Sequence, residues 1–273
     1  MQGTFHSHTV FSDGRLTVEQ LLKKFKSKKI THLAITDHDN AGAYSQAINA
    51  ADELNLTLFT GLEFSSQFKK YSECHIIGLR IDRNHPELKT YETRILGGRK
   101  TRAETIIRKM QEMGVELEPE IIVDLYNNPS VGRPHIAKIL IDKKVVRTTA
   151  EAFSIYLNPG KSLYVAKDQM DASEVIPLIH RLGGIAVLAH PATFYQEDDV
   201  KELIGYGLDG IEVIHPLHKT KTSVKWRTFA EENNLVISGG SDYHGIDKSE
   251  EKNIVKYKLE GDDLRHLLDR LGN

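Results

Sequence analysis

Short apolar runs alternate with helical patterns along most of the chain, and this alternation restricts the possible folds more than any other feature of the sequence. Strands are predicted at residues 31–36, 56–60, 74–79, 185–189, 210–214 and 235–238, and helices at 17–28, 43–54, 172–182, 200–206 and 223–233. The first helix begins at a capping box formed by Thr17 and Gln20. Because strands and helices that alternate in this way build parallel sheets covered by helices, we predict an α/β fold.

The alternation stops between residues 91 and 167, where helical patterns follow one another without strands. We therefore predict a barrel formed by residues 1–90 and 168–273, and a small inserted helical domain formed by residues 91–167. A length of 273 residues suits one α/β barrel with such an insert. The insert begins with a basic segment, residues 94–110, which is interpreted either as a solvated helix face or as a lid that attracts phosphate groups.

Composition narrows the class of protein. The net charge of −2 argues against binding of long nucleic acids through overall charge, although it is compatible with a local basic patch. The single cysteine, Cys74, cannot form an internal disulfide, and its apolar surroundings predict a buried side chain. The sequence has no apolar run long enough to span a membrane and does not open with a signal-peptide pattern, so we expect a cytoplasmic protein.

Histidines and carboxylates gather at the ends of the predicted strands. His6 and His8 are two residues apart, so on a strand they point to the same side and can bind one ion. Imidazole and carboxylate groups suit divalent first-row metal ions, and active sites of parallel barrels lie at the carboxyl ends of the strands. The candidates for a polynuclear metal site are His6, His8, Asp13, His38, Glu63, His75, His190, Asp242 and His244.

These residues occur in a set of motifs that is highly specific as a whole. The motifs are His6-Ser7-His8, Ser12-Asp13-Gly14, Thr36-Asp37-His38, Gly61-Leu62-Glu63, His75, Ala189-His190-Pro191 and Gly240-Ser241-Asp242-Tyr243-His244. In this set the chain resembles the polymerase-and-histidinol-phosphatase (PHP) superfamily of metal-dependent phosphoesterases, over about residues 3–90 and 165–245. The resemblance implies a distorted barrel of seven strands, a (β/α)7 relative of the TIM barrel.

The resemblance also implies a site for two or three divalent ions. One ion would be bound by His6, His8, Glu63 and Asp242, a second by Asp13, His38 and His244, and a third by Glu63, His75 and His190, with Glu63 as a bridge. Manganese is favoured, with iron and zinc as alternatives. A metal-activated hydroxide would attack phosphorus in line, while the ions neutralise the phosphate oxygens.

Two segments indicate the nucleotide-phosphatase branch of this superfamily. Gly132-Arg133-Pro134-His135-Ile136-Ala137 opens a predicted helix of the insert, where an arginine fork and a helix N-terminus suit phosphate binding. Glu212-Val213-Ile214-His215-Pro216, followed by His218, resembles a second segment of that branch. The predicted substrate contacts are Arg133, His135, His215 and His218, with a structural helix start and a surface loop as the alternative interpretations.

The leading hypothesis is a metal-dependent phosphoesterase similar to the nucleoside 3′,5′-bisphosphate phosphatases and AMP-releasing exonucleases of that branch. Its partner would be a small nucleotide or short oligonucleotide, not a long nucleic acid or a membrane. One alternative is histidinol-phosphate phosphatase, against which the segment at Arg133 and the carboxylate at Asp13 both count. Another is a non-catalytic metal-binding module, which would be expected to lack some of the ligands.

The remaining motif residues have less specific interpretations. Asp37 and Asp39 are predicted either to orient imidazoles or to cap loops. Gly14, Gly61 and Gly240 are expected to serve tight turns or close packing, not phosphate binding.

Overall fold

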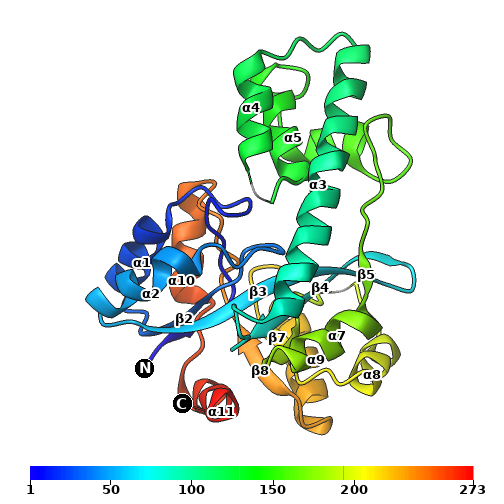
Figure 1. The fold of residues 1–273 in the computed structure, drawn as a ribbon. Coiled ribbons are helices and arrows are strands. Elements are labelled where there is room, and N and C mark those ends of the chain that lie inside the picture. The colour runs from blue at the N-terminus through cyan, green and yellow to red at the C-terminus, as the bar shows by residue number, and fades with distance from the viewer. Residues whose placement is uncertain (129, 193, 273) are drawn as a thin grey trace.

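The computed structural model describes residues 1–128, 130–192 and 194–272. Its centre is a nearly closed barrel in which seven strands follow the order β1-β2-β3-β4-β6-β7-β8 (Figure 1). The strands are β1 (Gly3–Thr4), β2 (His32–Ile35), β3 (Thr57–Phe68), β4 (Tyr71–Leu79), β6 (Ile185–Leu188), β7 (Gly210–Ile214) and β8 (Val236–Gly239). A short strand, β5 (Met170–Asp171), pairs with β3 outside this path. The predicted α/β barrel of seven strands is confirmed.

Hydrogen bonds between the first and last strands close the barrel. The amide of Phe5 donates to the carbonyl of Gly239 at 3.0 Å, and the amide of His8 donates to the carbonyl of Tyr243 at 2.9 Å. Gly240 lies on this seam, and a Cβ atom there would be only 2.6 Å from the amide nitrogen of His6. The glycine therefore serves close packing, as predicted, and holds the segment that carries His6 against the loop that follows β8.

Helices cover the outside of the barrel, as the alternation predicts. They are α1 (Val18–Ser27), α2 (Tyr44–Glu53), α7 (Ala172–Arg181), α8 (Glu197–Gly205), α9 (Thr220–Glu232), α10 (Glu251–Lys256) and α11 (Gly261–Leu271), with a 3-10 turn η2 at Lys248–Glu250. Helix α1 begins at the predicted capping box, in which Thr17 and Gln20 exchange hydrogen bonds of 3.0 and 3.3 Å. Sequence analysis did not predict α10 or α11. Leucines of α11 pack in one apolar cluster with Phe5 and Leu79 of the barrel interior.

Strand β4 runs antiparallel to both of its neighbours, so the expectation of a parallel sheet is wrong at this position. Strand β3 does not end at residue 60 as predicted but continues to Phe68, and residues 69–70 turn the chain directly into β4. Lys69 takes a positive φ of 50°, which suits the tight turns that join antiparallel strands. As a consequence, Glu63 lies within a strand and not after it, and it shares a pair of hydrogen-bonded strands with His75, which was predicted to lie in a strand.

The described part of the insert is helical. It contains α3 (Pro86–Glu112), α4 (Pro119–Asn127), α5 (Arg133–Asp142), α6 (Thr149–Ala152) and the π-helical turn η1 (Phe153–Leu157). Met110, Leu140 and Leu163 belong to an apolar cluster that this segment forms among its own side chains. Figure 1 shows that α3 runs from the barrel up into the insert, across the predicted boundary at residue 91. The boundaries of the insert remain a prediction.

A buried ion pair attaches α3 to the barrel. Arg99 of α3 pairs with Asp39, which follows β2, and both side chains are buried. Asp39 also accepts hydrogen bonds from the hydroxyl of Tyr91 at 2.5 Å and from the amide of Ser65 at 2.7 Å. Burial alone would raise the pKa of Asp39, but the guanidinium and these hydrogen bonds lower it to about 2. Asp39 thus positions the insert. Sequence analysis had predicted that it either orients imidazoles or caps a loop, and it did not predict this role.

Asp37 stabilises the loop that follows β1. Its carboxylate accepts hydrogen bonds from the amide and hydroxyl of Thr9, at 2.7 and 2.6 Å, and from the hydroxyl of Ser12 at 2.6 Å. The structure therefore favours the loop-capping interpretation of Asp37. Because the Ser12 hydroxyl also lies 3.4 Å from Nδ1 of His8, this loop supports one of the predicted ligands as well.

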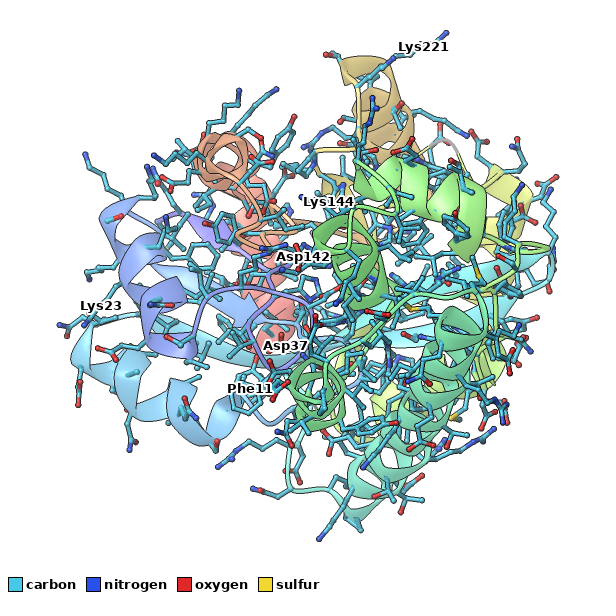
Figure 2. All side chains as sticks on the ribbon, turned by 90° about the horizontal axis from the view of Figure 1, so that it is seen from above. Phe11, Lys23, Asp37, Asp142, Lys144 and Lys221 are labelled. Carbon is cyan, nitrogen blue, oxygen red and sulfur yellow. The ribbon has the colours of Figure 1, made fainter. Side chains whose placement is uncertain are left out.

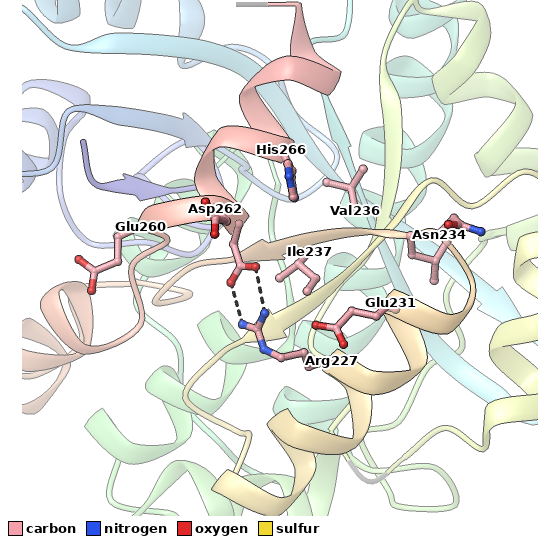
Figure 3. Close-up of a pocket in the computed structure, with 11 residues that line it drawn as sticks. Arg227, Glu231, Asn234, Val236, Ile237, Glu260, Asp262 and His266 are labelled. Carbon is pink, nitrogen blue, oxygen red and sulfur yellow. Dashed lines mark hydrogen bonds and ion pairs between the residues drawn. The ribbon is translucent and has the colours of Figure 1, made fainter.

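A separate pocket of about 770 Å³ lies at the end of the barrel opposite to the predicted metal ligands. Figure 3 shows it between α9, β8 and α11, where Arg227 pairs with Asp263 at 2.7 Å. It lies beside Val236 at the start of β8, whereas Asp242 follows the end of that strand. Among the described residues, the helices include none that is both long and apolar enough to cross a membrane.

We expect Gly240→Ala to destabilise the protein by about 1–3 kcal/mol, because the added methyl group would push the seam between His6 and Gly240 apart. Denaturant-induced unfolding measures this change. The matched control is Gly97→Ala in α3, where a Cβ atom meets nothing within 4 Å and helix propensity predicts a gain of up to about 1 kcal/mol. Equal stability of the two variants would contradict the packing role of Gly240.

Candidate metal centre

The nine residues predicted as metal ligands meet at one end of the barrel. His6, His8 and Asp13 follow β1, His38 follows β2, His190 follows β6, and Asp242 and His244 follow β8. Glu63 projects from β3 and His75 from the first half of β4, opposite Ser65. Because β4 is antiparallel, its beginning lies at the same end as the carboxyl ends of the parallel strands. The reversal therefore brings His75 to the other ligand candidates.

Glu63 is the centre of this cluster. Its side chain is 1% exposed and lies between five imidazoles from four segments of the chain. The distances from its carboxylate oxygens are 3.2 Å to His6, 3.3 Å to His8, 3.1 Å to His38, 2.8 Å to His75 and 3.1 Å to His190. A carboxylate with this surrounding can bridge ions held by the imidazoles on either side of it.

Two further carboxylates, Asp13 and Asp242, lie within the cluster. Asp13 lies 3.2 Å from His244 and 3.7 Å from His38, so these three predicted ligands of one ion do converge. Asp242 lies 3.3 Å from His6 and 3.1 Å from His8, as predicted for a second ion. Groups whose ligand atoms all lie within 4.8 Å of one another include His8-Asp13-His38-His244, His6-His8-Asp242, His6-Glu63-His190 and His38-Glu63-His75.

The unpaired atoms in the cluster fit cations. Among the described residues, buried atoms without a hydrogen-bond partner include Nε2 of His6 and His8, Nδ1 of His38 and His75, Oε2 of Glu63 and Oδ1 of Asp242. Unsatisfied buried polar atoms are costly, and nitrogen and oxygen lone pairs that converge in this way are the donor set of divalent metal ions. Burial lowers the pKa of His38 to about 3, which keeps its imidazole neutral and able to donate a lone pair.

Electrostatics hold the central carboxylates in the charged form. Burial alone would raise the pKa of Glu63, but His38, His6 and His75 hold it well below its usual range. For His75 the direction is reversed: burial alone would lower its pKa, but the carboxylates of Glu63 and Glu73 raise it to about 9. The cluster therefore consists of groups whose charges depend on one another, which is the electrostatic situation that bound cations relieve.

Glu212 also belongs to this centre, and sequence analysis cited it only within a motif. It is fully buried in β7, and its two oxygens lie 3.1 and 3.2 Å from Nδ1 of His6. It also accepts a hydrogen bond from the amide of His190 at 2.8 Å. These contacts orient two ligand candidates at once. The signal in the sequence was an acidic residue in an otherwise apolar strand.

The predicted substrate contacts have different surroundings in the structure. Both ring nitrogens of His218 are engaged, with the carbonyl of Val213 and the amide of Ala192, at 2.9 Å each. His215 is buried, and its Nε2 lies 3.4 Å from Asp242, beside the ligand cluster. The ring nitrogens of His135 lie 3.0 Å from the Gly132 amide and 3.1 Å from the Asn128 amide group, so this side chain caps α5. Substrate contact by these three histidines stays a prediction.

Arg133 lines a cavity of about 140 Å³ beside the ligand cluster. The wall of this cavity includes Asp13, His38 and His75 on one side and four cationic residues on the other: Arg99, Arg102, Arg133 and Lys167. Sequence analysis named Arg133 individually, placed Arg99 and Arg102 in the basic segment, and did not identify Lys167. Within the described structure, Nη1 of Arg102 is buried without a hydrogen-bond partner. An anion is the ligand that such a nitrogen lacks.

Burial affects the charges of the cationic wall. Burial lowers the pKa of Arg102, and together with the neighbouring guanidinium groups of Arg99 and Arg133 it brings this pKa to about 10. It also lowers the pKa of Lys167 to about 8, although Glu73 opposes this effect. Cations held this closely together repel one another, and a bound anion would remove that repulsion.

The insert lies over the mouth of the barrel and contacts the ligand loops directly. The hydroxyl of Ser130 donates to the carbonyl of His38 at 2.6 Å, and the side-chain amide of Asn128 donates to the carbonyl of Ser12 at 3.0 Å. In Figure 2, which looks down on the molecule, the insert helices lie nearest the viewer and Asp37 appears beside them. The cavity is therefore walled by both the insert and the barrel.

Comparison with known proteins agrees with this geometry. The family model of the PHP domain matches residues 4–216. The chain belongs to the PHP domain family. This confirms the family resemblance, and membership of a family of metal-dependent phosphoesterases implies divalent metal ions. The number and identity of the ions are a separate question.

Two relatives match this chain over most of its length. The chain is 32% identical over 246 residues to the 5′-3′ exoribonuclease Rnm of Salmonella typhimurium, covering 88% of this chain and 84% of that protein. It is 31% identical over 253 residues to a 3′,5′-nucleoside bisphosphate phosphatase of Chromobacterium violaceum, covering 88% and 85%. Both relatives are hydrolytic phosphoesterases by name, which confirms the predicted class of enzyme.

Solved structures share the PHP fold. A structure from Chromobacterium violaceum, described as an amidohydrolase with bound sulfate and no metal, has a TM-score of 0.86 and 27% identity, over 99% of this chain and 97% of that one. A structure from Bifidobacterium adolescentis, provisionally described as a metal-dependent phosphoesterase, has a TM-score of 0.88 and 24% identity, over 98% and 96%.

We expect Glu63→Gln to weaken divalent-metal binding more than about tenfold, because the central charge among the imidazoles is removed while the shape is kept. Metal content after dialysis against limiting manganese measures this effect. Glu92→Gln is the control, since Glu92 is a partly buried carboxylate that accepts a hydrogen bond from Ala41 outside the cluster. Full metal content in Glu63→Gln would show that this carboxylate is not a ligand.

Proposed function

We propose that this PHP protein hydrolyses phosphate esters of small nucleotides that carry two phosphate groups, or of short oligonucleotides with a terminal phosphate. The observation that carries the proposal is the cavity of about 140 Å³ with ligand candidates on one side and four cations on the other. One phosphate would react at the metal centre, and the second would bind the cations. This arrangement favours substrates with two anionic groups a short distance apart.

The metal centre would hold two or three divalent ions, with manganese favoured over iron and zinc. One ion would be held by His6, His8, Glu63 and Asp242, another by Asp13, His38 and His244, and a third by Glu63, His75 and His190, with Glu63 as a bridge. Ions bound there would supply Lewis-acid activation of water and of the phosphate oxygens. The chain itself contributes orientation: Glu212 fixes the ring of His6, and Asp37 fixes the loop that carries His8 through Ser12.

The cationic wall would bind the phosphate that does not react. Arg102 has an unpaired buried nitrogen, and Arg133 presents its guanidinium at the edge of the cavity, stacked 5.4 Å from the ring centre of Phe153. Arginine forks bind phosphate oxygens in pairs, and the buried setting strengthens each contact. The relatives named as a bisphosphate phosphatase and as exoribonucleases support this substrate class.

Histidinol-phosphate phosphatase is the weaker alternative. Histidinol phosphate bears one phosphate and an amine. The four cations beside the metal centre would repel this amine, which is protonated at neutral pH. The non-catalytic module is weaker still, because all nine predicted ligands are brought together around Glu63, Asp13 and Asp242.

A panel of four substrates tests the proposal: adenosine 3′,5′-bisphosphate, AMP, histidinol phosphate and a short RNA, each with manganese and with a chelator. We expect chelator-sensitive phosphate release from the bisphosphate, or AMP release from the RNA. Preference for histidinol phosphate would move the function to the first alternative. Lack of turnover of all four compounds would favour the non-catalytic module.

Arg102→Met should raise the KM for the bisphosphate about tenfold while leaving the KM for a nucleoside monophosphate within about twofold, because only the former places a phosphate against the cations. Steady-state kinetics with both substrates measure this difference. The control is Arg108→Met, one of the basic residues of α3 that does not line the cavity. Equal losses with both substrates would contradict the two-site arrangement.

The KM for the bisphosphate should rise as the pH increases through about 8. Burial lowers the pKa of Lys167 to about 8, so its ammonium group loses its proton there and stops attracting phosphate. The kinetics are measured from pH 6 to 10 with the wild type and with Lys167→Arg, whose guanidinium stays charged over this range. A rise that persists unchanged in Lys167→Arg would rule out Lys167 as its source.

A further inference from the structure

Glu73 connects the metal centre to the cationic wall. It lies near the start of β4, two residues before His75, and lines the same cavity. One carboxylate oxygen pairs with Arg133, and the other pairs with Lys167 and lies 3.3 Å from Nε2 of His75. Its side chain is 35% exposed, far more than that of Glu63 at 1%. Glu73 therefore occupies the position in the cavity where a phosphate would meet Arg133 and Lys167.

The charges around the cavity have a simple balance. Four cationic side chains line the wall, and two carboxylates pair with them, Asp39 with Arg99 and Glu73 with Arg133 and Lys167. Apart from Asp13, which belongs to the predicted metal ligands, four positive and two negative charges leave a net charge of two positive units. A phosphate monoester at neutral pH carries about −1.5 to −2 charges. Glu73 thus lowers the positive charge that an arriving phosphate meets from three units to two.

The two carboxylates differ in how easily an anion could replace them. Asp39 is buried and receives hydrogen bonds from Tyr91 and Ser65 in addition to its ion pair, so it is fixed. Glu73 is one-third exposed, and its partners are the charged groups of the cavity. A side chain in this setting can rotate toward solvent when a phosphate arrives and return when it leaves.

We propose that Glu73 is a specificity-determining residue that competes with the non-reacting phosphate for Arg133 and Lys167. This inference rests on the proposed function and deepens it. The competition makes a single phosphate bind weakly enough to be released after turnover, and it keeps inorganic phosphate and sulfate from occupying the cavity. The competing anion is the carboxylate of Glu73, which is part of the protein. The cationic wall therefore binds firmly only a ligand that is also held at the metal centre.

The test is Glu73→Gln, which removes the charge and keeps the shape. The control is Asp168→Asn, which removes one charge next in sequence to Lys167 from an exposed ion pair with Arg94. Both are assayed at about pH 6, well below the pKa of about 8 that Lys167 has in the wild type, because removal of the Glu73 charge lowers that pKa. We expect Glu73→Gln to lower the KM for adenosine 3′,5′-bisphosphate and the inhibition constant of inorganic phosphate about tenfold each, and to lower kcat through slow product release.

The comparison substrate separates this role from a structural one. With a nucleoside monophosphate that binds only at the metals, Glu73→Gln should change the KM much less than with the bisphosphate, and its metal content should equal that of the wild type. Loss of metal, or equal changes with both substrates, would mean that Glu73 only orients His75 and would overturn the proposal. A higher KM for the bisphosphate in Glu73→Gln would overturn it too, since it would mean that Glu73 holds Arg133 in a binding-competent position.

A second measurement does not depend on turnover. Inorganic phosphate should raise the melting temperature of manganese-loaded Glu73→Gln more than it raises that of the wild type or of Asp168→Asn, because ligand binding to the folded state stabilises it. Equal rises would overturn the role of Glu73 even if the wild type hydrolyses the bisphosphate. A larger rise in Glu73→Gln would support it even if none of the nucleotides proves to be a substrate.

Discussion

The carboxylate of Glu63 is the group on which the rest of the site depends. It is almost completely buried, and burying a carboxylate costs several kcal/mol unless cations or hydrogen-bond donors surround it. The imidazoles that surround it come from segments that follow β1, β2 and β6 and from β4, so their meeting requires a closed barrel. The seam between Phe5 and Gly239 and the close approach of Gly240 to His6 supply that closure. Closure of the barrel is therefore required both by the fold and by the grouping of the predicted metal ligands around Glu63.

The β3–β4 hairpin explains why metal centre and anion cavity lie side by side. In a strand, residues two apart point to the same face, so Glu73 and His75 both face the mouth while Cys74 between them is fully buried in the core. His75 reaches Glu63, and Glu73 reaches Arg133 of the insert. Because β4 is antiparallel to its neighbours, its beginning lies at the end of the barrel where the ligand candidates meet, so both side chains reach the mouth. The antiparallel hairpin is therefore a functional feature.

The sequence predicted the barrel and all nine ligand candidates because both have local signals: apolar periodicity for the strands, and His or Asp in specific motifs. It did not predict that β4 is antiparallel, because strand direction follows from a short turn at Lys69 whose residues are not typical turn formers. The cationic wall was only partly predicted. Arg99 and Arg102 lie in one basic helix, but Lys167 lies 65 positions after Arg102, and only tertiary packing brings them together. The role of Glu73 has no signal in the sequence.

The separation of tasks between barrel and insert follows from where the charges lie. The barrel contributes every predicted metal ligand, whereas three of the four cavity cations, Arg99, Arg102 and Arg133, belong to α3 and α5. Ser130 and Asn128 fix the insert to the loops of His38 and Ser12, so the distance between cations and ligands is set by direct hydrogen bonds. Under the proposed function, changes in the insert would therefore alter which second phosphate is accepted, while Glu63 keeps its place in β3. Glu73 belongs to the barrel and contacts both His75 and the cations, so under the proposal above a single carboxylate there would adjust substrate selection while the metal centre stays intact.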